Sequence, residues 1–508
     1  MSAPEIDPIA LQVLGGGLRA ICDEMGAVLV RAAHSPNIKE RRDCSTALFD
    51  AAGELVMQAE HIPVHLGSMP EAVAAVAGED QEPGVTWILN DPFRGGTHLP
   101  DITLISPLFA DERLIGWSAS RAHHADVGGP TPAGMPADSR RLEDEGVVIS
   151  PRRIDDGGLA ELAELMRNPA QRRADLRAQL AANRLGAKRL DELIERHGLE
   201  TTLAGMRAVL EHAERGARAA IAALPDGTYR ADDELESPDG SAVAVRVEAV
   251  IEGESLRLDF SGSAGQVEGN LNCPLAVTRA AALFAVRVLT DPDAPPSAGA
   301  YRPVEIVAPE GSVLNARPGA AVAAGNVETS SRVADVVLAA LGGVAEGPAQ
   351  GQGTMNNLTL AGAGDSEGFT YYETLGGGQG ACRDAPGPSA VHVAMSNTLN
   401  TPIEALETEL PLRVRELGLR RDSGGEGAQR GGDGLIRELE ALTAMRYTLI
   451  GERRSRGPRG AEGGRDGLPG RNLLNGEELP AKASGELNPG DRLRIETPGG
   501  GGYGDPKA

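Results

Sequence analysis

The sequence is poor in cysteine, with four residues in a chain of 508. They lie far apart, at Cys22, Cys44, Cys273 and Cys382, and no CxxC pair occurs. Disulfide frameworks and thiolate zinc sites need paired or closely spaced cysteines, so this distribution argues against both. It predicts reduced thiols and therefore a cytoplasmic protein.

Long apolar segments are also missing. No charge-free apolar run is long enough to span a bilayer. The first residues, which include Glu5 and Asp7, lack the basic and apolar regions of a signal peptide. We therefore expect neither membrane insertion nor export.

Basic residues are scarce relative to acidic ones. The 49 Lys and Arg residues against 73 Asp and Glu residues give a net charge of −24. Such a surface repels phosphates, which argues against a nucleic-acid or membrane-surface binder. None of the lysines lies in a GxxxxGK[ST] loop, and the GxSxG and HExxH motifs are absent too. Chemistry on a nucleoside triphosphate would therefore need a second polypeptide.

The spacing of apolar residues predicts a multidomain α+β protein with mixed sheets. An amphipathic helix is expected over residues 9–33 and a hairpin over residues 46–57. Helical spacing returns over residues 154–224, which indicates two or three antiparallel helices. The period then changes to two, as in strands, with further helices expected at residues 276–289 and 330–341.

These changes of pattern predict four regions, in order along the chain. They are a metal-site α/β region (1–150), a helical segment (151–225), an α+β domain (226–345) and a Gly-rich β domain (346–508). In the last region, residues 435–450 are expected to be strand. Its glycine-rich segments do not fit a dinucleotide-binding fingerprint, so we interpret them as tight turns and loops. They are residues 351–353, 376–380, 424–434 and 499–504.

Histidines are unevenly distributed. Six of the nine lie in the first quarter of the chain: His34, His61, His65, His98, His123 and His124. A single histidine is usually an ordinary hydrogen-bonded core or loop residue, so only a convergence of several predicts chemistry. His61 and His65 have helical spacing, but Pro63 between them breaks a helix. Loop packing is expected there, with His65 as a candidate pocket residue.

The best convergence surrounds a predicted hairpin. Two strand-like runs flank a turn at residues 110–113. A hairpin centred in this turn places Asp101 opposite Ala122 and His123 at the same end of the sheet, where opposed Cα atoms are about 5 Å apart. His98, just before the first strand, would lie at that end as well.

His98, Asp101 and His123 together form a plausible metal site. Two imidazoles and a carboxylate suit Mn, Fe(II) or Zn and leave coordination positions open for water and substrate. Such a site polarises a carbonyl, or supplies metal-bound water with a pKa near about 7 as a nucleophile. Asp43 is a candidate fourth ligand or an orienting partner. His124 is a weaker candidate, because alternation along a strand turns it away from His123.

Two glutamates in apolar surroundings are further candidates. Glu328 and Glu373 could each act as a general base. The alternative is that they are buried carboxylates paired with basic side chains. Spacing alone does not decide between these interpretations.

Long motifs along the whole chain resemble the hydantoinase B family. In the N-terminal part they are residues 7–9, 24–26, 35–41, 61–69, 90–102 and 123–129. In the remainder they are residues 259–262, 325–330, 397–404, 422–425 and 498–506. One position departs from the family, since members often have a cysteine where this chain has Thr46, so a thiol role there is not expected.

The resemblance implies a partner. Family members work with a hydantoinase A-type ATPase subunit, which would supply the ATP site that this chain lacks. In the hydrolase branch the partner phosphorylates the carbonyl oxygen of a cyclic amide, and the B subunit brings water to the activated carbon. In the carboxylase branch an enol phosphate meets activated carbon dioxide, and the metal site resembles His98, Asp101 and His123.

Three hypotheses follow. The first is the hydrolytic B subunit of an ATP-dependent cyclic amidase, acting on 5-oxoproline or a hydantoin within a hetero-oligomer. The second is a subunit of an ATP-dependent ketone carboxylase with the same site and partner. The third is a non-catalytic scaffold for the ATPase subunit.

Overall fold

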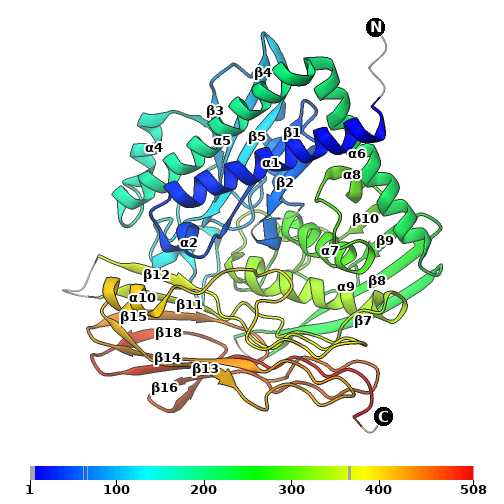
Figure 1. Cartoon of the computed structure of the whole chain (residues 1–508). Coiled ribbons are helices and arrows are strands. Elements are labelled where there is room, and N and C mark those ends of the chain that lie inside the picture. Colours follow the sequence, from blue (N-terminus) through cyan, green and yellow to red (C-terminus); the bar gives the residue numbers. More distant parts are fainter. Residues whose placement is uncertain (1–5, 61, 66, 239, 364–367, 507–508) are drawn as a thin grey trace.

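The computed structural model describes residues 6–60, 62–65, 67–238, 240–363 and 368–506. In these ranges the strands form four sheets, of six, four, four and five strands. Figure 1 shows the first sheet beside α1 and α5, α7 and α9 in the middle of the molecule, and the strands of the two C-terminal sheets stacked below. The predicted multidomain α+β architecture with mixed sheets is confirmed.

The first sheet is antiparallel throughout. Its order is β2 (Leu55–Glu60), β1 (Cys44–Asp50), β5 (Arg113–His123), β4 (Asp101–Ala110), β3 (Thr86–Leu89) and β6 (Arg152–Ile154). The hairpin expected over residues 46–57 is β1 with β2. The central strands β5 and β4 are almost wholly buried, so the sheet is covered on both faces.

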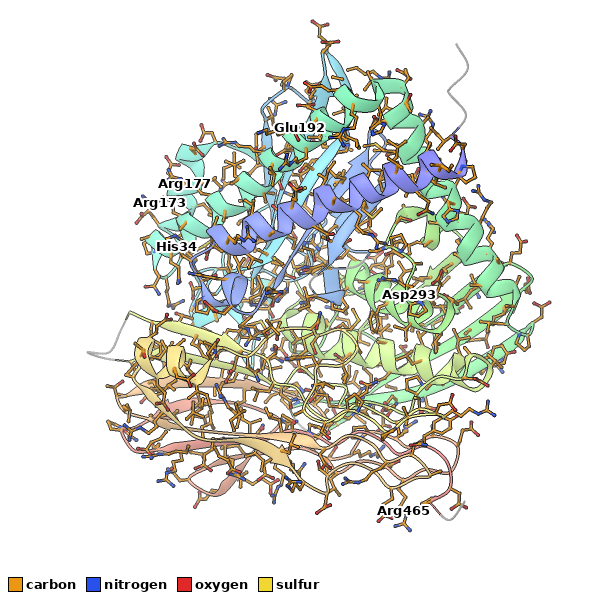
Figure 2. All side chains as sticks on the ribbon, in the orientation of Figure 1. His34, Arg173, Arg177, Glu192, Asp293 and Arg465 are labelled. Atoms are coloured by element: carbon orange, nitrogen blue, oxygen red, sulfur yellow. The ribbon has the colours of Figure 1, made fainter. Side chains whose placement is uncertain are left out.

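Helices of the N-terminal half cover this sheet (Figure 1). They are α1 (Pro8–Ala32), α2 (Pro36–Lys39), α3 (Met69–Ala77), α4 (Asp156–Ala163), α5 (Pro169–His197) and α6 (Leu199–Ala222). The predicted N-terminal helix and the predicted helical segment are both confirmed. Figure 2 shows Arg173 and Arg177 of α5 at the outer edge of the molecule.

The first helix forms for local reasons and packs by its apolar stripe. Asp7 caps α1 by accepting the N–H of Ala10, and a proline at its first position fixes the entry. Leu18 and Met25 on its inner face are buried. Gly186 lets α5 approach closely, because a Cβ there would lie 2.5 Å from the sulfur of Met25.

The second sheet belongs to the middle of the chain. Its order is β10 (Val304–Val307), β9 (Ser255–Asp259), β8 (Ala242–Glu252) and β7 (Gly227–Glu236). Helices α7 (Leu275–Thr290), α8 (Ala298–Tyr301) and α9 (Ser330–Ala345) lie in the same region. Val245 and Leu258 of the sheet share one apolar core with Ala281 of α7 and Val337 of α9.

The C-terminal region contains the other two sheets, which share a core. One has the order β12 (Thr370–Glu373), β11 (Asn357–Gly362), β15 (Met445–Ile450) and β18 (Lys482–Leu487). The other has the order β13 (Leu412–Arg420), β14 (Gly434–Ala441), β19 (Arg492–Glu496), β16 (Arg471–Leu474) and β17 (Glu477–Leu479), with α10 (Ile403–Glu409) before β13. The continuous strand predicted over residues 435–450 is wrong, because β14 and β15 belong to different sheets.

Residues 351–353 and 376–380 were expected to be tight turns, and for residues 376–380 this is wrong. None of the glycines in this segment has the positive φ of a tight turn. The segment is instead hydrogen-bonded to other extended glycine segments: Gly378 donates to the carbonyl of Pro498, and Gly432 donates to that of Gln379, both at 2.9 Å. A Cβ at Gly378 would lie 2.0 Å from the carbonyl oxygen of Gly432. Glycine is needed for close packing of backbones here.

None of the helices within the described ranges combines the length and apolarity that crossing a bilayer requires.

Candidate metal centre

Three buried side chains meet at one end of the first sheet. His98, Asp101 and His123 each offer a ligand atom, and these atoms lie within 4.8 Å of one another. The Nδ1 atom of His98 is 3.0 Å from one carboxylate oxygen of Asp101, and the Nδ1 atom of His123 is 3.4 Å from the other. The three residues are at most 3% exposed. The predicted convergence is therefore present.

The hairpin brings them together by a register that differs from the predicted one. Asp101 pairs directly with His123 and Ile102 with Ala122, because the ladder shifts by one residue between Leu108 and Phe109. The sequence prediction assumed a regular ladder and placed Asp101 opposite Ala122, which is wrong. A bulge is an extra residue on one strand. Here it moves the carboxylate directly opposite an imidazole.

The donor set fits a divalent cation. Within the described chain, the Nδ1 atom of His98, the Oδ1 atom of Asp101 and the Nε2 atom of His123 are buried and make no well-formed hydrogen bond, and the only close polar contacts of the first two are within the cluster itself. A buried polar atom without a partner costs about 1–3 kcal/mol, so three of them on adjacent side chains need a common explanation. A cation held by imidazole nitrogens and a carboxylate oxygen provides one.

The carboxylate of Asp101 is held in its charged form. Burial alone would raise the pKa of Asp101, but the neighbouring His98 and His65 hold it well below its usual range. The Thr97 hydroxyl donates to its Oδ2 atom at 2.7 Å, and the Nε2 atom of His65 lies 3.3 Å from the same oxygen. The hydroxyl of Ser45 lies 3.1 Å from the Nδ1 atom of His65. His65 is thus an orienting partner of Asp101, while His61 lies outside the described residues.

Asp43 lies next to this cluster but is not one of its three members. Its backbone carbonyl accepts the N–H of His123 at 3.0 Å, and its side chain is buried. Burial raises the pKa of Asp43 to about 6, with the charge of Asp101 acting in the same direction and His123 and Arg41 opposing it. A role as fourth ligand stays a prediction.

Other sequence-predicted candidates have structural partners. The Nε2 atom of His124 lies 2.9 Å from the amide oxygen of Gln179, away from the cluster as expected. The carboxylate of Glu373 pairs with Arg437 at 3.3 Å, which favours the paired-carboxylate interpretation. Thr46, at the position where the family often has cysteine, donates its hydroxyl to a backbone carbonyl at 2.8 Å.

The wall that faces the hairpin comes from later parts of the chain. The ring of Tyr372 on β12 stacks on that of His123 with centroids 4.7 Å apart and planes inclined by 12°. The Tyr372 hydroxyl donates to Asn357 at 2.6 Å, and Asn357 donates to Glu328 at 2.8 Å. On the other histidine, the amide nitrogen of Asn326 lies 3.5 Å from the Nε2 atom of His98.

Asn326 and Glu328 both belong to one π-helical turn, Gly325–Thr329, which leads into α9. Such turns are rare and are frequent at functional sites. Gly325 is required here, because a Cβ would lie 1.8 Å from the carbonyl oxygen of Asn272. Sequence reasoning did not identify Asn326, Asn357 or Tyr372. The only available signal was the family-like motif at residues 325–330.

Glu328 is fully buried, and its environment favours the protonated form of its carboxyl group. Burial raises its pKa to about 8, and repulsion from Glu452 adds to this effect. One of its oxygens accepts hydrogen bonds from Asn357 and from the N–H of Met355, and the other has no partner in the described chain. Its role as a general base stays a prediction.

Known proteins are similar to this chain over nearly its whole length. A 5-oxoprolinase from Dictyostelium discoideum is 38% identical over 98% of this chain, which covers 40% of that protein. The crystal structure of an ATP-dependent caprolactamase from Pseudomonas jessenii matches with a TM-score of 0.91 and 28% identity, over 99% of this chain and 92% of the other. A nucleotide-free acetone carboxylase structure matches with a TM-score of 0.88 and 20% identity, over 98% and 76%, and shows the fold alone.

The chain corresponds to only part of the first curated relatives, because the matched region makes up 40% to 42% of their length. The match to the family model nevertheless covers nearly the whole chain. The family model described as Hydantoinase B/oxoprolinase matches residues 7–506, and the chain therefore belongs to this family.

Proposed function

We propose that this chain is the hydrolytic subunit of an ATP-dependent amidase that opens cyclic amides such as 5-oxoproline or a hydantoin. Two similar proteins are named for ring amides, one a 5-oxoprolinase and the other an ATP-dependent caprolactamase. The chain has no GxxxxGK[ST] loop, so ATP would be used by a separate subunit of the hydantoinase A type. In the 5-oxoprolinase relative, the matched region is only 40% of the polypeptide. The remainder is long enough to contain the ATP-using part in the same chain.

The observation that carries this proposal is the buried cluster of His98, Asp101 and His123, whose candidate ligand atoms converge and include three that make no well-formed hydrogen bond. These residues would hold a divalent metal such as Mn, Zn or Fe(II), with Asp43 as an accessory ligand. When bound, such an ion polarises a carbonyl and lowers the pKa of water toward about 7.

The other residues of the site would position this cluster and keep it dry. Thr97 and His65 fix the carboxylate of Asp101, and Asn326 lies against the outer nitrogen of His98. Tyr372 covers His123 and is itself held by Asn357. A site closed in this way excludes bulk water, which favours addition of one ordered water to the activated amide carbon. Breaking of the C–N bond then opens the ring and releases the nitrogen as an amine, and a second water hydrolyses the resulting acyl phosphate to a carboxylate and inorganic phosphate.

The test uses the chain produced together with a hydantoinase A-type ATPase. We expect ring opening of 5-oxoproline or a hydantoin that requires ATP and does not require bicarbonate, and that is lost when His98 and His123 are replaced by Ala. A requirement for bicarbonate would instead identify the ketone carboxylase. Full activity without the three ligands would indicate a scaffold, and activity of the isolated chain would contradict the two-subunit proposal.

A further inference from the structure

A buried guanidinium close to the metal centre has few partners. Arg41 is 0% exposed, and no ion pair joins it to a carboxylate of the described residues. Its Nη2 atom donates to the hydroxyls of Thr374 and Thr398, at 2.7 and 3.1 Å. Its Nε and Nη1 atoms are buried and have no hydrogen-bond partner in the described chain.

Other arginines buried to the same degree have either a carboxylate partner or a full set of hydrogen bonds, although Arg172 and Arg332 also have two nitrogens without a hydrogen-bond partner in the described chain. Arg172, Arg332 and Arg437 each have a carboxylate oxygen of a described residue within 3.3 Å. Arg121 has no such ion pair, but it donates with all three of its nitrogens to neutral oxygens. Arg41 therefore combines a buried charge with unused donors, which is costly unless an anion completes the site.

The immediate surroundings of Arg41 offer hydrogen bonds but no negative charge within ion-pair distance. The hydroxyls of Thr374 and Thr398 lie 2.7 Å apart. The Nε2 atom of His392 lies 3.2 Å from the Thr398 hydroxyl, and its Nδ1 atom lies 3.0 Å from that of Ser396. Burial, together with the charge of Arg41, lowers the pKa of His392 to about 3, so this ring is neutral. The charge of Arg41 also acts on the buried carboxylate of Asp43, but the two form no ion pair, so the guanidinium keeps free N–H groups that suit an oxyanion.

The guanidinium lies one aromatic ring away from the metal cluster. Its central carbon is 5.8 Å from the centroid of the Tyr372 ring, which stacks on His123 at 4.7 Å. Arg41 also precedes Asp43 by two residues, in the segment that enters β1. A ligand held by Arg41 would thus lie close to the Tyr372 ring that covers His123.

We propose that Arg41, with Thr374 and Thr398, forms an oxyanion-binding subsite beside the metal centre, and that it takes the phosphoryl group of the activated substrate. The identity of this anion rests on the proposed function, in which the partner subunit phosphorylates the amide oxygen. Arg41 would hold the phosphoryl group and thereby orient the adjacent carbon toward the metal cluster. A phosphoryl group offers several oxygen acceptors for the unused N–H groups.

The test measures binding of inorganic phosphate to the full chain without partner, ATP or ring substrate. Phosphate is expected to raise the melting temperature of the wild-type chain more than acetate does at equal ionic strength, because it binds the folded state. R41M should weaken phosphate binding by roughly 10-fold to 100-fold, and R41K should lose less. R113M, which removes one exposed charge, is the control and should bind phosphate normally.

Several outcomes would overturn this subsite. Protection that persists in R41M, or that disappears from the wild-type chain on metal removal by EDTA, would assign phosphate to the metal alone. Stronger protection by acetate would reject the phosphoryl group as the ligand. Metal content of R41M, measured in the same samples, shows whether the variant is folded. If phosphate binding depends on Arg41 but no ring is opened with the partner, the hydrolase proposal fails and the oxyanion subsite stands.

Discussion

The two walls of the metal centre are built in different ways. The hairpin wall, with His98, Asp101 and His123, comes from one short stretch of chain whose strands pair directly. The facing wall, with Asn326 and Tyr372, comes from a π-helical turn and a strand of another sheet. The first wall holds the candidate ligands, and the second orients and covers them. The candidate cation ligands are thus local in sequence, whereas the side chains that cover them, unlike Thr97 beside Asp101, come from distant segments.

Removing ligands from the hairpin wall should have the largest effect. We expect the double substitution of His98 and His123 by Ala to abolish stoichiometric metal and to reduce activity with the partner to background, because only one of the three donors remains. Elemental analysis of purified protein measures the first effect. The His124→Ala variant is the control, since His124 points to Gln179. Unchanged metal content in the double variant would reject the assignment.

A substitution in the facing wall should lower the stability of the fold more than it disturbs the three candidate ligands. Gly325→Ala should destabilise the protein by about 3 kcal/mol, because the new Cβ would meet a backbone carbonyl oxygen at 1.8 Å. Gly343→Ala in α9 is the matched control, since a Cβ there has no atom within 4 Å. It should be neutral or stabilising by up to about 1 kcal/mol. Equal urea denaturation curves for the two variants would contradict the close backbone contact at Gly325.

A smaller effect is expected when a side chain that supports a candidate ligand is changed instead of the ligand itself. Thr97→Val removes the hydroxyl that donates to Asp101 but keeps the size of the side chain. Metal affinity should fall by roughly 10-fold to 100-fold, as is usual for loss of a partner behind a ligand. Competition with a chelator measures it. Thr278→Val removes an equally buried hydroxyl that bonds a distant backbone carbonyl, and it should leave the affinity unchanged.

The facing wall should also respond to pH through Glu328. Its pKa in the folded chain is about 8 against an ordinary value of 4.5, so the folded state holds a proton that the unfolded state releases. The associated stability is complete below about pH 4.5 and is lost as the pH rises to about 8. Over this pH range the free energy of unfolding of Glu328→Gln should therefore change less than that of the wild type, by more than about 1 kcal/mol.

The measurement is the free energy of unfolding at pH 5 and at pH 8 for both proteins. Glu310→Gln changes an exposed carboxyl that is 75% accessible and serves as the control. If the wild type and Glu328→Gln lose stability in parallel between the two pH values, Glu328 is already charged in the folded state.

The comparison also explains where the sequence prediction succeeded and where it did not. The convergence of His98, Asp101 and His123 could be predicted because two strands joined by a short turn must bring their outer ends together. The exact register could not, since the ladder shift between Leu108 and Phe109 has no clear mark in the sequence. Residues 376–380 were misassigned for a related reason. Glycine permits positive φ in a turn, but it also permits close packing of extended backbones, and neighbours distant in sequence decide which occurs.

The sequence by itself determined the residue types that can hold a cation, the helices with an apolar stripe, the absence of a nucleotide-phosphate loop and the resemblance to the family. These properties depend on local spacing and on composition. Only the tertiary structure decided that Tyr372 covers His123, that Asn326 lies against His98 and that Arg41 is buried without a carboxylate partner. Such contacts join segments hundreds of residues apart, and burial and partner choice are set by that packing rather than by any local pattern.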